Sequence, residues 1–255
     1  MSLSAQGISI RFGGLVALSG VGVSVDPGTV TGLVGPNGAG KTTLFNCLTG
    51  VAMPQEGKVS VDGRDISGMR IEDRIRLGIS RTFQTPRLDL RASVADAVML
   101  GFTPREPQSL LQAVLPFSRA RATEARLRAR AEALIDEFQL TTDPDMPAGE
   151  LSLGRLRLLE VARALASEPR YLLLDEPAAG IDDVDRGLLA SAIRKAAGRG
   201  LGVLLVEHNV AFVADLSDRM LALVNGRVVA QGVPSAVVSD PQVVSAYLGE
   251  QRVAA

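Results

Sequence analysis

The chain has 255 residues, of which 46% are hydrophobic, enough to bury a sizeable core in one large domain or two small ones. Its formal net charge is -1, which excludes the strongly basic field of a general nucleic-acid-binding protein. No apolar stretch approaches the ~20 residues of a membrane-spanning helix. We expect no signal peptide, and the single cysteine, Cys47, suggests a reducing compartment.

The first third of the chain predicts β-strands, because its apolar residues alternate or run together. The expected strands are residues 8–12, 21–25, 30–34, 59–61 and 78–83. We expect a turn at residues 26–28 and a hairpin at Asp62-Gly63, a favoured two-residue turn. Cys47 would be a small core residue of a helix that follows the third strand.

Residues 93–139 predict helix. The apolar residues recur at helical spacing on one face: Leu127, Ala131, Leu134, Ile135 and Phe138. Arginines occupy the other face: Arg119, Arg121, Arg126, Arg128 and Arg130. We interpret this charge run as a solvated helix face rather than a lipid or nucleic-acid patch.

The last third alternates strand and helix. Residues 171–174 and 201–206 are continuous apolar runs, typical of strands buried on both faces of a parallel sheet. Helices at about 184–197 and 211–216 would cover them, and a hairpin at Asn225-Gly226 and a short helix would follow. The pattern predicts an α/β core interrupted by a helical insertion at roughly 85–165.

A glycine-rich segment matches the phosphate-binding pattern G-x-x-x-x-G-K-[ST]. Its residues are Gly35, Pro36, Asn37, Gly38, Ala39, Gly40, Lys41 and Thr42. The segment follows an apolar strand and begins a helical run at Thr43, as the pattern requires. The glycines let backbone N–H groups approach phosphate oxygens, Lys41 supplies a charge for the β- and γ-phosphates, and Thr42 supplies a hydroxyl ligand for Mg²⁺. Lysine is rare in this chain, so a chance match is a poor explanation and we predict nucleotide binding.

Two acidic residues follow the apolar run 171–174. Asp175 suits coordination of Mg²⁺, directly or through water, and Glu176 suits a base or water-orienting residue in attack on the γ-phosphate. Such a pair alone more often begins a solvated loop, but the presence of the phosphate loop favours the catalytic role.

His208, the only histidine, follows the run 201–206. This is the strand end at which open α/β sheets bind ligands, so we expect His208 to have a role in the site.

These motifs, in this order, resemble the ATP-binding subunits of ABC transporters over nearly the whole chain. The resemblance implies a single domain spanning 1–255, with a P-loop NTPase core of ABC type, an N-terminal antiparallel β part and an inserted helical subdomain at roughly 85–165. It also implies an ATPase that binds ATP and Mg²⁺ and couples hydrolysis to transport.

The resemblance assigns roles to single residues. Phe12 resembles the aromatic that stacks on adenine, and Gln84 resembles the glutamine that contacts Mg²⁺ or water and senses the membrane partner. Asp182 would lie in the loop that crosses to a second subunit, and His208 would hold the γ-phosphate. The implied catalytic set is therefore Lys41, Gln84, Glu176 and His208.

Residues 151–155, Leu-Ser-Leu-Gly-Arg, depart from the family's usual L-S-G-G-Q. The groups that would face a γ-phosphate are the Ser152 hydroxyl, the Gly154 N–H and the dipole of the following helix. All three are retained. Arg155 keeps the donor capacity of glutamine and adds a charge that phosphate should tolerate. We interpret the segment as modified but working, with Ser152 also serving as a helix N-cap.

Three shorter matches resemble one branch of the family, the ATPases of importers of branched-chain or hydrophobic amino acids. They are Arg81-Thr82-Phe83-Gln84, Glu176-Pro177-Ala178-Ala179-Gly180 and Ala246-Tyr247-Leu248-Gly249-Glu250. Related ATPases for urea uptake or lipopolysaccharide export share much of the same sequence, so these alternatives stay open.

The implied partners are transmembrane permease subunits, a second ATPase subunit that is identical or homologous, and indirectly a substrate-binding protein, with no nucleic acid. The protein would be cytoplasmic and peripheral on the cytoplasmic face of the membrane. Two other classes compete: a soluble ABC-type switch acting on ribosomes or DNA, and a non-hydrolysing nucleotide-binding scaffold. The chain lacks the second domain or long coiled-coil insert that is usual for the first, and Lys41, Gln84, Glu176 and His208 argue against the second.

Overall fold

The computed structural model describes residues 1–82, 88–102 and 117–253. They fall into two compact units. One unit comprises Met1–Arg81, Arg170–Glu176 and Arg194–Ala255, and the other comprises Thr82–Pro169 and Pro177–Ile193. Among the described residues, no helix combines the length and the apolar character that crossing a membrane requires.

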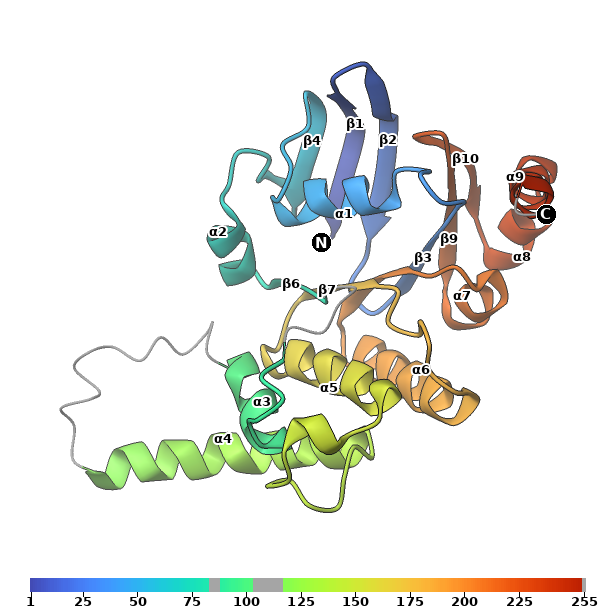
Figure 1. Ribbon diagram of the computed structural model, residues 1–255. Helices are drawn as coiled ribbons and strands as arrows, with labels where there is room; N and C mark the ends of the chain where they lie inside the picture. Colours follow the sequence, from blue (N-terminus) through green and yellow to red (C-terminus); the bar gives the residue numbers. More distant parts are fainter. Residues whose placement is uncertain (83–87, 103–116, 254–255) are drawn as a thin grey trace. The chain divides into compact units, whose positions relative to one another are not determined.

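An antiparallel sheet begins the first unit (Figure 1). In the order β2-β1-β4-β5, its strands are β1 (Leu3–Phe12), β2 (Leu15–Val25), β4 (Glu56–Val61) and β5 (Arg64–Asp65). The first two strands are longer than predicted, because the pairing shifts register between Ala5 and Ile8 and such an irregularity interrupts the strict alternation on which the prediction relied. The hairpin at Asp62-Gly63 is confirmed, with φ of 53° and 81° as a type I′ turn requires.

The second sheet of this unit is mainly parallel. In the order β10-β9-β3-β8-β7-β6, it contains β3 (Val30–Val34), β6 (Ile79–Arg81), β7 (Tyr171–Asp175), β8 (Gly202–Val206), β9 (Arg219–Val224) and β10 (Arg227–Gly232). Every residue of β3, β7 and β8 is buried, which explains their continuous apolar sequences. The predicted hairpin at Asn225-Gly226 joins β9 to the antiparallel edge strand β10.

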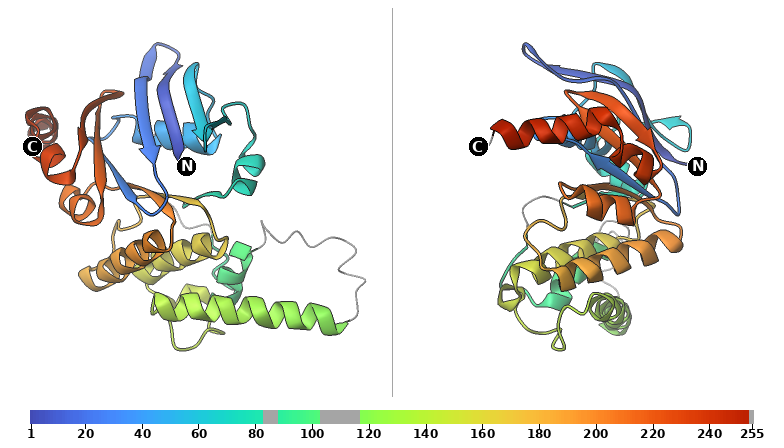
Figure 2. Two further views of the ribbon diagram at one scale, coloured as in Figure 1. Left: turned by 180° about the vertical axis from the view of Figure 1, so that it is seen from behind. Right: turned by 90° about the vertical axis from the view of Figure 1, so that its right-hand side faces the viewer.

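Helix α1 (Lys41–Thr49) packs on the antiparallel sheet and contributes Leu44, Phe45 and Leu48 to the core of this unit (Figure 1). Helices α8 (Pro234–Val238) and α9 (Pro241–Val253) pack against β9 and β10 (Figure 2). The unit also contains α2 (Ile71–Arg76), α7 (Val210–Leu216) and the end of α6 (Asp183–Gly198), from Arg194 onward. The short helix α2 was not predicted, because its apolar residues Ile71 and Ile75 are exposed.

A buried arginine on α2 binds the carbonyl groups at the C-terminal end of α1. Arg74, on α2, is 1% exposed and donates hydrogen bonds to the carbonyls of Cys47 (2.7 Å), Leu48 (2.8 Å), Ser67 (2.9 Å) and Met69 (3.3 Å). Two of these carbonyls belong to the last turn of α1, where backbone oxygens lack helical partners. A cation at this end also favours the helix dipole, so Arg74 stabilises the helix that follows the phosphate loop.

The second unit is helical. It contains α3 (Val94–Met99), α4 (Phe117–Glu137), α5 (Leu153–Ala166) and the beginning of α6 (Asp183–Gly198). Helices α3, α4 and α5 pack on one another. Their buried residues include Val94, Val98, Ala131, Ile135, Phe138, Leu158, Leu159 and Ala162. The predicted apolar stripe of α4 therefore faces this core.

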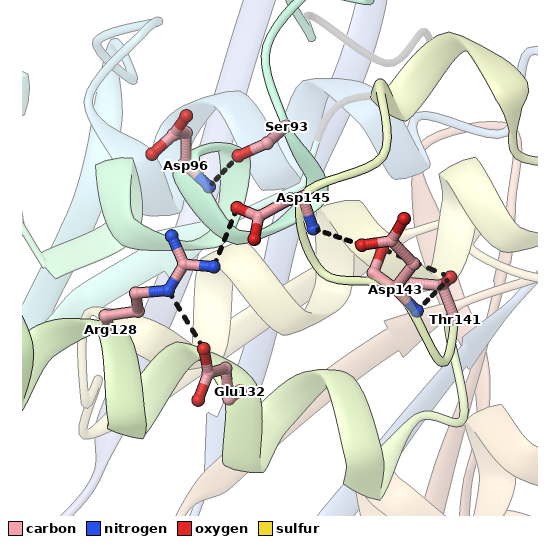
Figure 3. A network of polar contacts seen from close by, with 7 residues as sticks. All are labelled: Ser93, Asp96, Arg128, Glu132, Thr141, Asp143 and Asp145. Carbon is pink, nitrogen blue, oxygen red and sulfur yellow. Dashed lines mark hydrogen bonds and ion pairs between the residues drawn. The ribbon is translucent and has the colours of Figure 1, made fainter.

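Two arginines of α4 form ion pairs within the helical unit. Arg128 lies between Glu132 (2.9 Å) of the same helix and Asp145 (2.7 Å) of the following loop (Figure 3). Arg130 pairs with Glu168 and lies over the Phe102 ring. The hydrogen bonds to Asp145 and Glu132 raise the pKa of Arg128. Arg128 and Arg130 therefore hold the helix within its own unit, which the prediction of a solvated face did not include. Arg126 is exposed as predicted, and the side chains of Arg119 and Arg121 lie outside the described residues.

Candidate functional site

The phosphate loop joins β3 to α1. Glycine is required at its two ends, because a Cβ on Gly35 would lie 2.1 Å from the Leu223 carbonyl oxygen, and one on Gly40 would lie 2.6 Å from that of Ala17. Between them, Pro36 is partly exposed, Asn37 and Gly38 are exposed, and Ala39 is buried. The loop therefore lies against neighbouring backbone on one side, while its middle stays accessible to a ligand.

Lys41 lies folded over this loop. The side chain is largely buried, with the residue 7% exposed, and its Nζ donates to the carbonyls of Gly35 (2.5 Å) and Pro36 (3.0 Å). Thr42 is exposed and Thr43 partly exposed in the first turn of α1. A fixed cation, a helix N-terminus and an accessible hydroxyl make a donor set that fits an anionic phosphate with Mg²⁺.

Asp175 ends β7 at the same edge of the sheet. Strand β8 pairs in parallel with both neighbours, matching Val206 with Leu33 and with Asp175. The phosphate loop after β3, the carboxylate at the end of β7 and His208 after β8 therefore come from one edge, as ligand sites of such sheets do. Burial raises the pKa of the Asp175 carboxyl, and the Arg81 guanidinium, with Nη2 at 3.6 Å from Oδ2, opposes that rise.

Glu176 and His208 form a pair at this edge. His208 Nε2 lies 2.6 Å from Glu176 Oε1. The backbone of Glu176 has a φ of 53°, an unfavourable conformation for a residue with a side chain, and its N–H donates to the Val206 carbonyl at 2.9 Å. The left-handed backbone turns the chain sharply at the end of β7. The Glu176 carboxylate is thus held against the histidine.

Phe12 ends β1 at the tip of the β1–β2 hairpin and is 56% exposed. An exposed aromatic at this place has no role in the core, so its position is compatible with the predicted stacking on adenine. Gln84 lies outside the described residues, and its predicted role stays a prediction.

The remaining predicted residues belong to the second unit. Ser152 is the N-cap of α5, and its Oγ accepts from the Arg155 N–H at 3.2 Å. Gly154 is buried, whereas Leu153 is 57% exposed. Asp182 lies just before α6, and its Oδ1 accepts from the Asp185 N–H at 2.8 Å. The N-cap prediction for Ser152 is confirmed.

The Arg155 side chain differs from the sequence-based expectation. Its Nε lies 3.0 Å from Asp185 Oδ1, and its Nη1 donates to the carbonyls of Phe138 (3.2 Å) and Gln139. These donors are used inside the unit rather than being held free for a phosphate. The reason is the buried carboxylate of Asp185, whose presence beside the segment no sequence pattern indicated.

Sequence reasoning also missed the contacts that two side chains make with the phosphate loop and with the helix that follows it. Arg81 donates to Asn46 Oδ1 (2.9 Å) and Thr49 Oγ1 (3.3 Å) of α1 while it pairs with Asp175. The Tyr247 hydroxyl, on α9, accepts the Gly35 N–H at 2.7 Å. Both residues lie in segments that resemble the importer branch of the family, but the sequence does not indicate these contacts.

Comparison with known proteins agrees with this geometry. The sequence profile described as "ABC transporter" matches residues 18–179, and one described as "Branched-chain amino acid ATP-binding cassette transporter" matches residues 227–253. The high-affinity branched-chain amino acid transport ATP-binding protein BraF of Pseudomonas aeruginosa is 36% identical over 97% of this chain and 98% of its own. The lipopolysaccharide export system ATP-binding protein LptB of Acidithiobacillus ferridurans is 37% identical over 98% of this chain and 97% of its own.

A crystal structure of the ADP conformation of an ATP-binding cassette of an ABC transporter has a TM-score of 0.84 at 32% identity, covering 98% of this chain and 99% of that one. The fold is therefore the α/β P-loop architecture of ABC type, with its antiparallel β part and its helical part. The chain belongs to the ABC transporter family, as an ATP-binding subunit whose ATP hydrolysis powers transport.

Proposed function

We propose that this subunit powers the uptake of branched-chain or other hydrophobic amino acids. The observation that carries the proposal is the match of residues 227–253 to the branched-chain amino acid profile. This segment covers β10, α8 and α9, and Tyr247 within it accepts the hydrogen bond from Gly35 at the start of the phosphate loop. The branch-specific segment is thus tied physically to the nucleotide site, which supports a functional rather than an incidental resemblance.

ATP would bind with its phosphates on Gly35–Thr43 and its adenine on Phe12. Lys41 would exchange its contacts with the Gly35 and Pro36 carbonyls for the β- and γ-phosphates. Glu176 would accept a proton from the attacking water, with His208 beside it at the γ-phosphate. Thr42, Asp175 and Gln84 would hold Mg²⁺, which when bound neutralises charge on the phosphates.

A second ATPase subunit, identical or homologous, would complete each site. In this proposal Ser152, Gly154 and Asp182 act on the ATP held by the partner's phosphate loop. Ser152→Ala should then cost about 2–4 kcal/mol of transition-state stabilisation, the usual scale for one donor. Leu153→Gly is the matched control, because the exposed Leu153 side chain is not one of the contacting groups.

The whole chain would be one domain, 1–255, with the helical subdomain at roughly 85–165 docking the permease subunits at the cytoplasmic face of the membrane. A substrate-binding protein would deliver the solute on the other side. A second candidate is lipopolysaccharide export, because LptB of Acidithiobacillus ferridurans matches at 37% identity.

The test is the ATPase rate of the transporter assembled from this subunit and the permeases encoded beside its gene. We expect stimulation by a binding protein loaded with leucine, isoleucine or valine, and none by the same protein without ligand. Stimulation by a binding protein loaded with urea, or by lipopolysaccharide without a binding protein, would replace this proposal with the corresponding alternative. Loss of the stimulated rate in Lys41→Ala controls for contaminating ATPases.

A further inference from the structure

A buried carboxylate lies against the glycine of residues 151–155. Asp185 has a side chain only 7% exposed, and a Cβ added to Gly154 would lie 2.4 Å from its Oδ2. Gly154 is one of the groups proposed above to face the phosphate of a partner's ATP. A negative charge at this place would repel that phosphate unless a cation compensated it, because burial leaves little solvent to screen the two charges.

Arg155 supplies that cation, and it is itself held in place. Its Nε lies 3.0 Å from Asp185 Oδ1, with the arginine side chain 25% exposed. Its Nη1 donates to the carbonyls of Phe138 and Gln139 at the end of α4. A guanidinium with partners on two sides has a fixed orientation, which a lysine could not reproduce.

Asp185 also forms a hydrogen bond with Asp182, in the loop before α6. The backbone N–H of Asp185 donates to Asp182 Oδ1 at 2.8 Å, so the start of α6 is capped by the residue predicted to cross to a second subunit. Through Asp185, Arg155 at the start of α5 is therefore linked to Asp182 at the start of α6.

We propose that Arg155 and Asp185 form a charge-compensated pair that positions Gly154 and Asp182 for a partner's ATP, with Arg155 acting as a positioning residue that does not touch the phosphate. The inference rests on the proposal that residues 151–155 act on the partner's nucleotide. One consequence is that Arg155→Gln, which introduces the residue usual in the family at this position, lowers the ATPase activity of this protein. The glutamine leaves the Asp185 carboxylate buried and uncompensated beside Gly154.

The test is a double-mutant cycle on the assembled transporter, measuring kcat and KM for ATP with Arg155→Gln, Asp185→Asn and the double variant. We expect Arg155→Gln to lower kcat/KM by roughly tenfold, a typical coupling for residues in contact. Asp185→Asn alone should have a smaller effect, and the double variant should recover most of the loss. Arg128→Gln is the matched control, because it removes an arginine from ion pairs of the same unit away from residues 151–155.

Three results would overturn the pair. Arg155→Gln could leave kcat/KM at the parental value, or change only the melting temperature, which would make the pair purely structural. The double variant could be no better than Arg155→Gln, as expected if Arg155 contacted phosphate directly.

Should Arg155→Gln fail to fold, Arg155→Lys replaces it; we then expect an intermediate loss of kcat/KM that Asp185→Asn relieves. If Ser152→Ala also costs nothing, the trans role of residues 151–155 fails; if Ser152→Ala is damaging while the cycle shows no coupling, only the pair fails.

Discussion

His208 Nε2 lies 2.6 Å from Glu176 Oε1, and the two residues follow neighbouring parallel strands. The contact joins the carboxylate proposed as the base to the side chain proposed to hold the γ-phosphate. Because Glu176 has a left-handed backbone, with φ of 53°, its side-chain direction is set by the turn as well as by the histidine. This arrangement favours catalysis that depends on orientation as much as on charge.

We therefore predict that His208→Ala lowers the steady-state ATPase rate about 10²–10³-fold, the scale seen when one group that stabilises the transition state is removed. Asn209→Ala is the neighbouring control. Asn209 caps α7 through a hydrogen bond from the Phe212 N–H, so its loss should cost about 1 kcal/mol of stability and leave turnover intact. Equal rates for the two variants would remove His208 from the mechanism.

Tyr247→Phe deletes the one oxygen that accepts the Gly35 N–H. A lost hydrogen bond of this kind costs about 0.5–1.5 kcal/mol, which corresponds to an increase of about 2–10-fold in the KM for ATP. We expect kcat to change little, because the hydroxyl contacts the loop and not the reacting atoms. Tyr171→Phe makes the same chemical change at the chain's other tyrosine, whose hydroxyl contacts Asp62; a similar KM increase there would show that the effect is not specific to the loop.

Arg74→Met should destabilise the fold by about 3–5 kcal/mol, because it leaves buried carbonyls without their donors and the end of α1 without a cation. The measurement is chemical denaturation followed by circular dichroism. Arg76→Met is the control on the same helix: the Arg76 side chain is 72% exposed in an ion pair with Asp73, and such pairs contribute about 0–1 kcal/mol. Comparable losses in both variants would contradict the role assigned to Arg74.

The buried thiol of Cys47 makes the free energy of unfolding depend on pH. Burial raises the pKa of its thiol from 9.0 to about 11, so the folded state retains the proton that the unfolded state releases. The resulting stability is fully present below pH 9 and is lost as the pH rises to about 11, by about 2–3 kcal/mol in total. In Cys47→Ala the decline that begins at about pH 9 should be absent. A decline between about pH 10 and 12 should remain, because the pKa of Tyr171 is raised from 10.0 to about 12 in the folded state.

Local sequence patterns predicted much of the first unit. Residues 30–34 form β3 with the expected bounds, and the turns at Asp62-Gly63 and Asn225-Gly226 adopt the positive φ that their residue types favour. Each of these features is decided by a few adjacent residues. The order of the strands in the sheet is not decided by adjacent residues, because β3 lies between β8 and β9, which come from the other end of the chain.

The same distinction between local and distant residues applies to the candidate site. Lys41, Asp175, Glu176 and His208 could be predicted as candidates because each lies in a short motif or directly after a buried strand. The ion pair of Arg155 could not be predicted, since its partner Asp185 is 30 residues away on another helix. A pairing of this kind depends on how helices pack, and no periodicity in the sequence encodes it.

The most direct test of the account is the ATPase rate of the full chain carrying Glu176→Gln, measured at saturating ATP together with ATP binding. The amide keeps the size of the side chain and an oxygen near His208 but removes the proton acceptor. We predict a turnover reduced by about 10²–10⁴-fold, with ATP binding retained and with binding lost only in the parallel Lys41→Ala variant. Hydrolysis by Glu176→Gln at the parental rate would contradict the assignment of the catalytic carboxylate and, with it, the mechanism proposed for this site.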